Sequence, residues 1–120
     1  MTQEALTRKQ IKDMKPGSKL DMLVATKLRG QVEDRHRPGN ILNGTHSTPP
    51  KEYSKDMNAA WEVEALFDQA TDLREAYAIE LHNVMGLMLH EPTTLSNVFQ
   101  FAHATPEQRC KAMLLAVLDL

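Results

Sequence analysis

The fold of this chain is decided by the stretch Tyr53-Ser54-Lys55-Asp56-Met57-Asn58-Ala59-Ala60-Trp61-Glu62-Val63-Glu64-Ala65-Leu66-Phe67. Ser54 is placed to accept a hydrogen bond from the free amides of a first helical turn, and Asp56 lies near the positive end of the helix dipole. Apolar residues recur at helical spacing, with the only tryptophan beside them: Ala60, Val63, Phe67 and Ala70. We expect a long helix whose inner face the rest of the chain covers.

Size and composition favour one soluble domain over residues 1–120. The chain is 42% hydrophobic and 25% charged, ordinary values for a globular protein, and its formal charge is −2. That balance provides no overall field to attract nucleic acid or an anionic membrane. The single cysteine, Cys110, excludes an internal disulfide and fits a reducing compartment. The polar N-terminus has no signal peptide or membrane span, so we expect a cytoplasmic protein without a membrane partner.

Two segments precede the tryptophan helix, and a long connection follows them. Residues 1–14 are expected to form an N-terminal arm with one or two helical turns. A helix over residues 19–29 is predicted by its apolar stripe and by Ser18 as its cap. Residues 31–52 are rich in polar residues, glycine and proline, and a connection this long is either functional or disordered. A flexible solvated insertion and a binding loop both remain open.

The segment after the tryptophan helix is expected to form the sheet. Tyr77, Ile79 and Leu81 alternate with Ala76, Ala78 and Glu80, which is typical of a half-buried strand. Two further strands are predicted over residues 84–90 and 97–102, and short consecutive strands favour antiparallel pairing.

The last helix has a complete set of start signals. Thr105 is a cap, Pro106 occupies the first helical position, and Gln108 closes a capping box. We therefore predict an α+β fold: a three-stranded antiparallel sheet packed with two to three helices, in the order α, long loop, α, β, β, β, α.

Three blocks of sequence now stand out together. The first is Pro16-Gly17 with Leu20-Asp21, Leu23-Val24-Ala25, Lys27 and Gly30. The second is Tyr53-Ser54, Asp56 and Ala59-Ala60-Trp61-Glu62-Val63. The third is Ala104-Thr105-Pro106, Arg109-Cys110-Lys111-Ala112 and Leu114-Leu115-Ala116-Val117-Leu118. In this order, from about residue 15 to the C-terminus, they resemble the phage ABA sandwich domain family.

The resemblance implies a small phage or prophage protein with a mixed α/β sandwich, acting in the bacterial host cell. It brings no catalytic residues and no cofactor with it. The chain departs from the family's compact pattern in the long connection before Tyr53 and in middle strands rich in methionine and histidine.

Candidate chemistry is sparse. The five histidines have no spacing typical of a metal site, although His82, His90 and His103 lie near predicted strand ends, so no metal is expected. Cys110 lies in the apolar stripe of the last helix, which favours a buried structural thiol over a nucleophile. Trp61 is interpreted as an anchor of the core or of a subdomain, and an aromatic platform of Trp61 and Tyr53 is the alternative. No motif predicts an enzyme or a cofactor.

The element order is also that of a double-stranded RNA binding domain. Such domains need a basic cluster at the start of the last helix, where only Arg109 and Lys111 occur and Glu107 opposes them. Nucleic acid is therefore a disfavoured partner.

Two hypotheses of different classes remain. The first is a non-enzymatic accessory protein that binds a host protein or sequesters a small ligand through the 31–52 segment, especially Arg35, His36, Arg37 and His46, and through the adjacent Tyr53. The second is a homo-oligomeric assembly module that pairs through the methionine-rich strand at Val84–Leu89.

Overall fold

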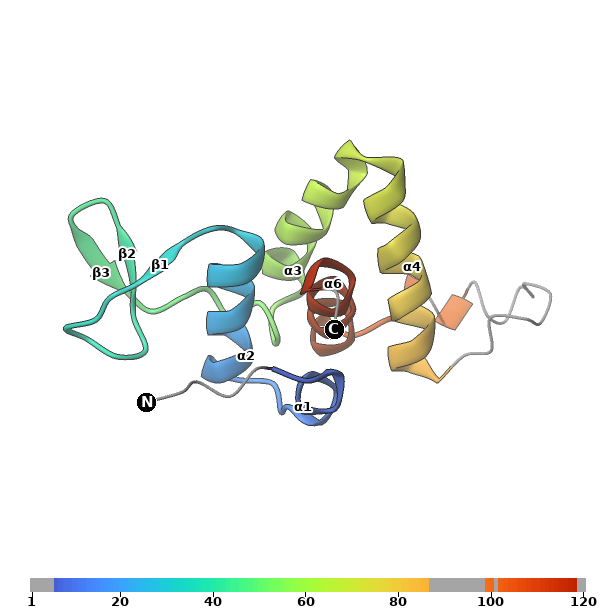
Figure 1. Cartoon of the computed structure of the whole chain (residues 1–120), viewed down its shortest axis with the longest axis horizontal. Coiled ribbons are helices and arrows are strands. Elements are labelled where there is room, and N and C mark those ends of the chain that lie inside the picture. The colour runs from blue at the N-terminus through green and yellow to red at the C-terminus, as the bar shows by residue number, and fades with distance from the viewer. Residues whose placement is uncertain (1–5, 87–98, 101, 119–120) are drawn as a thin grey trace.

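The protein is a helical body with a small β-sheet that extends from one end of it (Figure 1). The computed structural model describes residues 6–86, 99–100 and 102–118. Within them, a three-stranded antiparallel sheet accompanies the helices, so the α+β class is confirmed. The position of the sheet in the chain and its relation to the helices differ from the prediction.

The first two helices form where the sequence predicts helix, although Ser18, the predicted cap, is the first residue of α2 and makes no capping hydrogen bond. α1 (Arg8–Asp13) begins with a capping box, in which Thr7 accepts a hydrogen bond from the Gln10 amide and the Gln10 side chain accepts one from the Thr7 amide. Ile11 of this helix is fully buried. α2 (Ser18–Leu23) begins after Gly17 and continues as the π-helix η1 (Val24–Leu28), so the predicted helix over 19–29 is confirmed with a wider last turn.

The sheet lies in the segment that was expected to be a flexible connection. Its strands are β1 (Val32–Glu33), β2 (Ile41–Asn43) and β3 (His46–Thr48), paired antiparallel in the order β1-β2-β3. Gly44, with a φ of 64°, opens the two-residue turn between β2 and β3, where a positive φ suits glycine and matches the twist of a hairpin. The prediction of a long loop without strands over 31–52 is therefore wrong.

The tryptophan-bearing segment is helical, with a different start from the predicted one. α3 (Met57–Glu64) is capped by Asp56, which accepts a hydrogen bond from the Asn58 amide at 2.9 Å, and it continues as the 3-10 helix η2 (Ala65–Gln69). Its predicted inner face is buried at Ala60, Val63 and Phe67, whereas Ala70 is exposed. Trp61 is 52% exposed, so its interpretation as a core anchor is wrong.

Residues predicted as strands form a helix instead. α4 (Thr71–Met85) contains all of the first predicted strand and the start of the second, and it ends at Gly86, whose φ is 73°. Tyr77 and Leu81, four residues apart, are buried, whereas Ile79 between them is 47% exposed, which is the pattern of one helix face. Residues 99–100 and 102 of the third predicted strand are helical. The remainder of these two predicted strands, 87–90, 97–98 and 101, lies outside the described residues.

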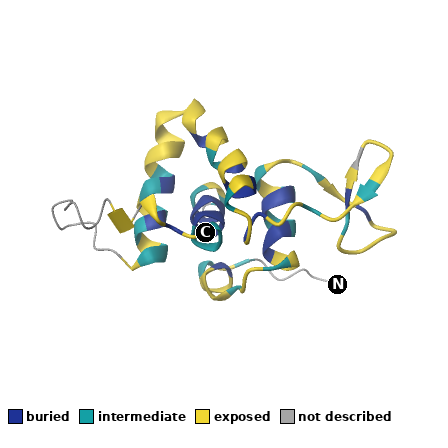
Figure 2. Cartoon of the chain, turned by 180° about the vertical axis from the view of Figure 1, so that it is seen from behind, coloured by how far each residue is buried: buried dark blue, intermediate teal, exposed yellow. Residues whose placement is uncertain are grey.

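The core is built around the last helix. α6 (Pro106–Leu118) starts with the predicted capping box, because the Gln108 amide donates to the Thr105 hydroxyl and the Gln108 side chain accepts from the Thr105 amide. Every residue from Arg109 to Leu115 is buried, and α6 packs chiefly on α4, with η1, α3 and α1 around it (Figure 2). Helices therefore pack on helices, and the prediction that α3 and α6 lie across the sheet is wrong.

Candidate functional site: a projecting sheet and the Asp21 junction at its base

The base of the sheet is joined to the helical body through a buried carboxylate. Asp21 of α2 is 4% exposed, and its Oδ1 accepts two hydrogen bonds from Ser54, one from the backbone amide at 2.8 Å and one from the hydroxyl at 2.7 Å. The Ser54 hydroxyl oxygen in turn accepts a hydrogen bond from the Gly17 amide at 2.9 Å. Ser54 thus links the segment after the sheet to the start of α2, instead of capping α3.

The same junction includes the thiol of α6. Cys110 is fully buried, and its Sγ donates to the Tyr53 carbonyl oxygen at 3.2 Å. Burial, with a smaller contribution from the charge of Asp21, raises the pKa of the Cys110 thiol to about 12. The thiol is therefore protonated at neutral pH, and the prediction that Cys110 is buried is confirmed. The three sequence blocks at Gly17–Asp21, Tyr53-Ser54 and Cys110 meet at this junction, which we call the Asp21 junction.

A second network closes the core on the other side of α6. Arg109 is 7% exposed and donates to Glu64 Oε2 at 2.6 Å and to the backbone oxygens of Ala102 and Ala104. The Tyr77 hydroxyl donates to the same Glu64 oxygen at 2.6 Å. The Lys111 ammonium donates to the Lys12 carbonyl oxygen at the end of α1. Both basic residues of the last helix are thus buried in internal contacts and do not present a surface to a phosphate backbone.

The loop between β1 and β2 is held in a defined shape by Asp34. The Asp34 carboxylate accepts a hydrogen bond from the His36 amide at 2.9 Å, and the Asn40 side chain, at the end of the loop, donates one to the Ser47 hydroxyl of β3. Interaction with the Ser47 hydroxyl, followed by the hydrogen bond from His36, lowers the pKa of the Asp34 carboxyl. Because these groups bind one another, the loop presents the side chains between them outward.

The structure separates the five residues that the sequence grouped into one binding site. Arg35, His36 and Arg37 are exposed on the β1–β2 loop. His46 is also exposed, but it follows the β2–β3 turn, which lies at the opposite end of the antiparallel strands. Tyr53 is 1% exposed, and burial raises the pKa of its hydroxyl, so its side chain belongs to the core and not to a binding surface.

One face of the sheet is apolar and exposed, and the sequence analysis did not single it out. Val32 and Leu42 are direct cross-strand partners and therefore lie on the same face, where they are 63% and 42% exposed. Ile41, on the opposite face, is 5% exposed and belongs to the core. The sheet is thus attached by one face, and the face with Val32 and Leu42, here called the outer face, is open.

Exposed Trp61 lies beside an ion-pair cluster on α3. The neighbouring Glu62 carboxylate contacts the Lys51 ammonium at 2.7 Å and the Arg29 guanidinium at 3.7 Å. The hydrogen bond from Lys51 is the main cause that lowers the pKa of Glu62. The cluster therefore connects α3 to Arg29, which precedes β1, and to Lys51, which follows β3. Since Tyr53 is buried, the two aromatic residues do not form a shared platform.

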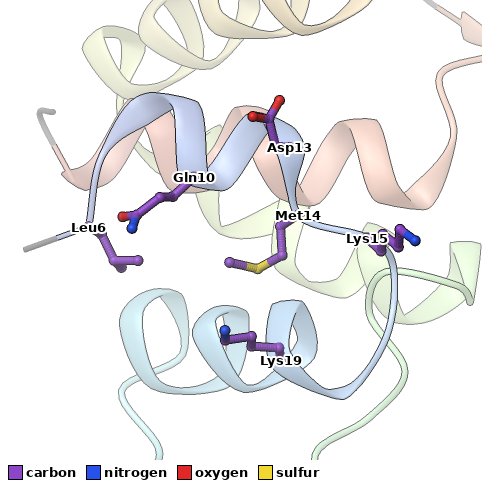
Figure 3. A pocket seen from close by; sticks show the side chains of 6 residues that line it. All are labelled: Leu6, Gln10, Asp13, Met14, Lys15 and Lys19. Carbon is purple, nitrogen blue, oxygen red and sulfur yellow. The ribbon is translucent and has the colours of Figure 1, made fainter. Parts of the chain in front are cut away.

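Hollows lined by described residues lie near these elements, and two of them bear on the site. The larger, of about 350 Å³, is open between α1 and α2, where Leu6 and Met14 face the gap and Asp13 points away from it (Figure 3). No set of polar groups converges in it.

The second hollow, of about 290 Å³, lies against the Asp21 junction, and we call it the Asp21 pocket. Its walls include Gly17, Gly39 of the β1–β2 loop and Pro49-Pro50 after β3, and its ionisable residues are Asp21, Glu52 and Lys55.

The histidines do not gather into a metal site within the described part of the chain. His36 and His46 lie apart on the sheet, the His82 ring contacts the Ala78 carbonyl oxygen within its own helix, and His103 stacks on Phe99. His90 lies outside the described residues. Among the residues that the structure describes, no three His, Cys, Asp or Glu side chains are grouped as metal ligands would be.

In residues 6–86, 99–100 and 102–118, no helix has the length and apolar character needed to cross a bilayer. Comparisons of the chain with protein-family models, with curated proteins and with solved structures gave no match.

Proposed function

We propose that the chain is a non-enzymatic accessory protein of phage or prophage type that binds another protein through the outer face of its sheet. The observation on which the proposal rests is the exposed pair Val32 and Leu42 on an element that extends from the body. Apolar side chains on an open sheet face are a common basis for recognition of a second protein. Arg35 and Arg37, exposed on the adjoining loop, favour a partner with an acidic rim around an apolar centre.

Two further features support a binding role. Cys110, the one thiol, is buried and protonated, and Asp34 is engaged in holding its own loop, so neither supplies a reactive group. The phage assignment rests only on the resemblance of the three sequence blocks to the phage ABA sandwich domain family, because the helical body does not form the α/β sandwich that the resemblance implies. The structural contribution of those blocks is the Asp21 junction, which fixes the sheet to the body.

The alternative is self-association through the same sheet. β1 and β3 have no strand partner on their outer edges within the described residues, and an open edge is a template for a second copy. The predicted methionine-rich strand does not provide such an edge, because Val84 and Met85 belong to α4. Light scattering over a dilution series distinguishes the two roles: a stable dimer supports self-association, and a monomer supports a foreign partner.

The test compares two matched double variants as immobilised baits in a bacterial lysate. Val32→Asp/Leu42→Asp changes the outer face, and Leu73→Asp/Ile79→Asp changes two comparably exposed apolar residues of α4. We expect a protein that the wild type and the α4 variant retain and the sheet variant loses, with all three baits equally folded by circular dichroism. Retention of the same proteins by all three folded baits would contradict the proposal.

A further inference from the structure

We propose that the Asp21 pocket binds a basic side chain, the guanidinium of an arginine or the ammonium of a lysine, from the partner protein. The assignment of the ligand to a partner rests on the proposed function. The binding of such a group by the pocket rests on the pocket alone.

The first observation is the state of Asp21. Asp21 as a residue is 4% exposed, and its Oδ2 is not among the buried oxygens without a hydrogen-bond partner, so this oxygen is open to solvent. Carboxylates in such largely buried residues are ordinarily paired with a cation. Both hydrogen bonds to Asp21 come from Ser54 and reach Oδ1. Among the described residues, Oδ2 accepts no hydrogen bond and no cation lies within ion-pair distance of the carboxylate. Asp21 lines the pocket, so a cation that enters it meets a fixed acceptor.

The second observation is the size of the pocket. Pockets for drug-sized ligands occupy roughly 300–1,000 Å³, and this one, at about 290 Å³, suits a single functional group. Gly17 and Gly39 contribute wall without side chains, and Pro49-Pro50 contributes a rigid apolar wall against which a flat guanidinium can pack. The pocket adjoins the β1–β2 loop, so a partner on the sheet is within reach of it.

The third observation is the charge of the lining. The ionisable residues of the lining are two acids, Asp21 and Glu52, and one base, Lys55, so the lining favours a cation over an anion. The Lys55 side chain forms no ion pair within the described part of the chain. It therefore acts as an internal competitor for the incoming cation, and its removal is expected to strengthen binding.

The experiment is a titration of the intact chain, followed by NMR of backbone amides, with N-acetyl-arginine amide, N-acetyl-lysine amide and the uncharged N-acetyl-citrulline amide. We expect saturable shifts at Gly17, Asp21 and Gly39 with a basic probe, a dissociation constant on the order of a millimolar, and no saturation with citrulline amide. Whichever basic probe binds more tightly identifies the side chain.

Variants of the lining give effects of opposite sign. Glu52→Gln should weaken binding about two- to fivefold and Lys55→Met should tighten it by a similar factor, as expected for interactions of exposed charges. Glu75→Gln and Lys9→Met make the same charge changes at exposed positions outside the pocket lining and should leave the affinity unchanged. Asp21→Asn keeps an acceptor for Ser54 and should abolish saturation.

Three results would overturn the inference: no saturable shift with either basic probe, equal binding of citrulline amide, or weaker binding by Lys55→Met. If Asp21→Asn does not fold, the Glu52 and Lys55 variants still test whether the pocket binds a cation. The probes need no partner protein, so a failed titration contradicts the pocket proposal without affecting the lysate test of the sheet. Likewise, a failed lysate test contradicts the proposed function without affecting a positive titration of the pocket.

Discussion

Removal of the Ser54 hydroxyl tests whether the Asp21 junction holds the sheet segment to the body. Ser54→Ala deletes the 2.7 Å hydrogen bond to Asp21 and the acceptor for the Gly17 amide, while the hydrogen bond from the Ser54 amide remains. A hydrogen bond to a charged group contributes about 1.5–3 kcal/mol, and a donor left without its partner adds further cost. Because Gly17 is only half-buried, we expect a total loss of about 3 kcal/mol in the free energy of unfolding.

The assay is urea denaturation followed by circular dichroism, with a thermal scan beside it. For a chain of this length a loss of about 3 kcal/mol lowers Tm by roughly 12 °C. The matched control is Ser18→Ala, one residue after Gly17, whose side chain is exposed and makes no hydrogen bond within the described part of the chain. We expect the control to lie within about 0.5 kcal/mol of the wild type. A Ser54→Ala variant as stable as the control would refute the role of the junction.

Three other outcomes follow from the core. Burial raises the pKa of the Cys110 thiol to about 12. Burial, with the hydrogen bond to Glu64, also raises the pKa of the Tyr77 hydroxyl, so both groups ionise in the unfolded chain first as pH rises. The stability that these two groups contribute is therefore fully present below the ordinary thiol pKa of 9.0 and declines as pH rises above it. Iodoacetamide should modify native Cys110 only as fast as the chain opens, and rapid stoichiometric labelling would show an exposed thiol. Trp61→Ala should cost less than about 1 kcal/mol, against about 3–5 for a core aromatic, and acrylamide should quench Trp61 fluorescence in the native state; full protection would place it in the core. Leu81→Ala should cost about 2–5 kcal/mol in urea unfolding, while Ile79→Ala costs under about 1; equal losses would indicate that α4 is not the packed element.

The start of α6 could be predicted because its signals are local. The capping box of α6 needs only Thr105 and Gln108, three residues apart, and both form the expected bonds. The inner face of α3 at Ala60, Val63 and Phe67 is likewise set by helical spacing. Neither prediction depends on which other elements pack against the helix.

The sheet was misplaced because periodicity is ambiguous over short runs. Tyr77, Ile79 and Leu81 alternate as in a strand, but Tyr77 and Leu81 are also spaced as on one helix face, and the exposure of Ile79 decides between them. Alanine, leucine and glutamate in the same stretch favour helix, a propensity to which the prediction gave too little weight. β1 to β3 are two or three residues long, too short to show alternation, although the turn at Gly44 was a usable signal.

The candidate site depends on contacts that sequence spacing does not reveal. Ser54 looks like a helix cap, and its actual acceptor, Asp21, lies 33 residues earlier. The outer face was missed because only the register of β1 with β2 places Val32 opposite Leu42. The exposed charged residues Arg35 and Arg37 were correctly expected at the surface, since charged residues in a polar loop are rarely buried.

The arrangement of these elements is tested most directly by backbone and side-chain nuclear Overhauser effects in the intact protein. The account predicts cross-strand contacts of Leu42 with Val32 and with Ser47, together with an unbroken series of amide–amide contacts from Thr71 to Met85. Cross-strand contacts within residues 76–90, and none between Val32 and Leu42, would contradict both the fold and the binding surface built on it.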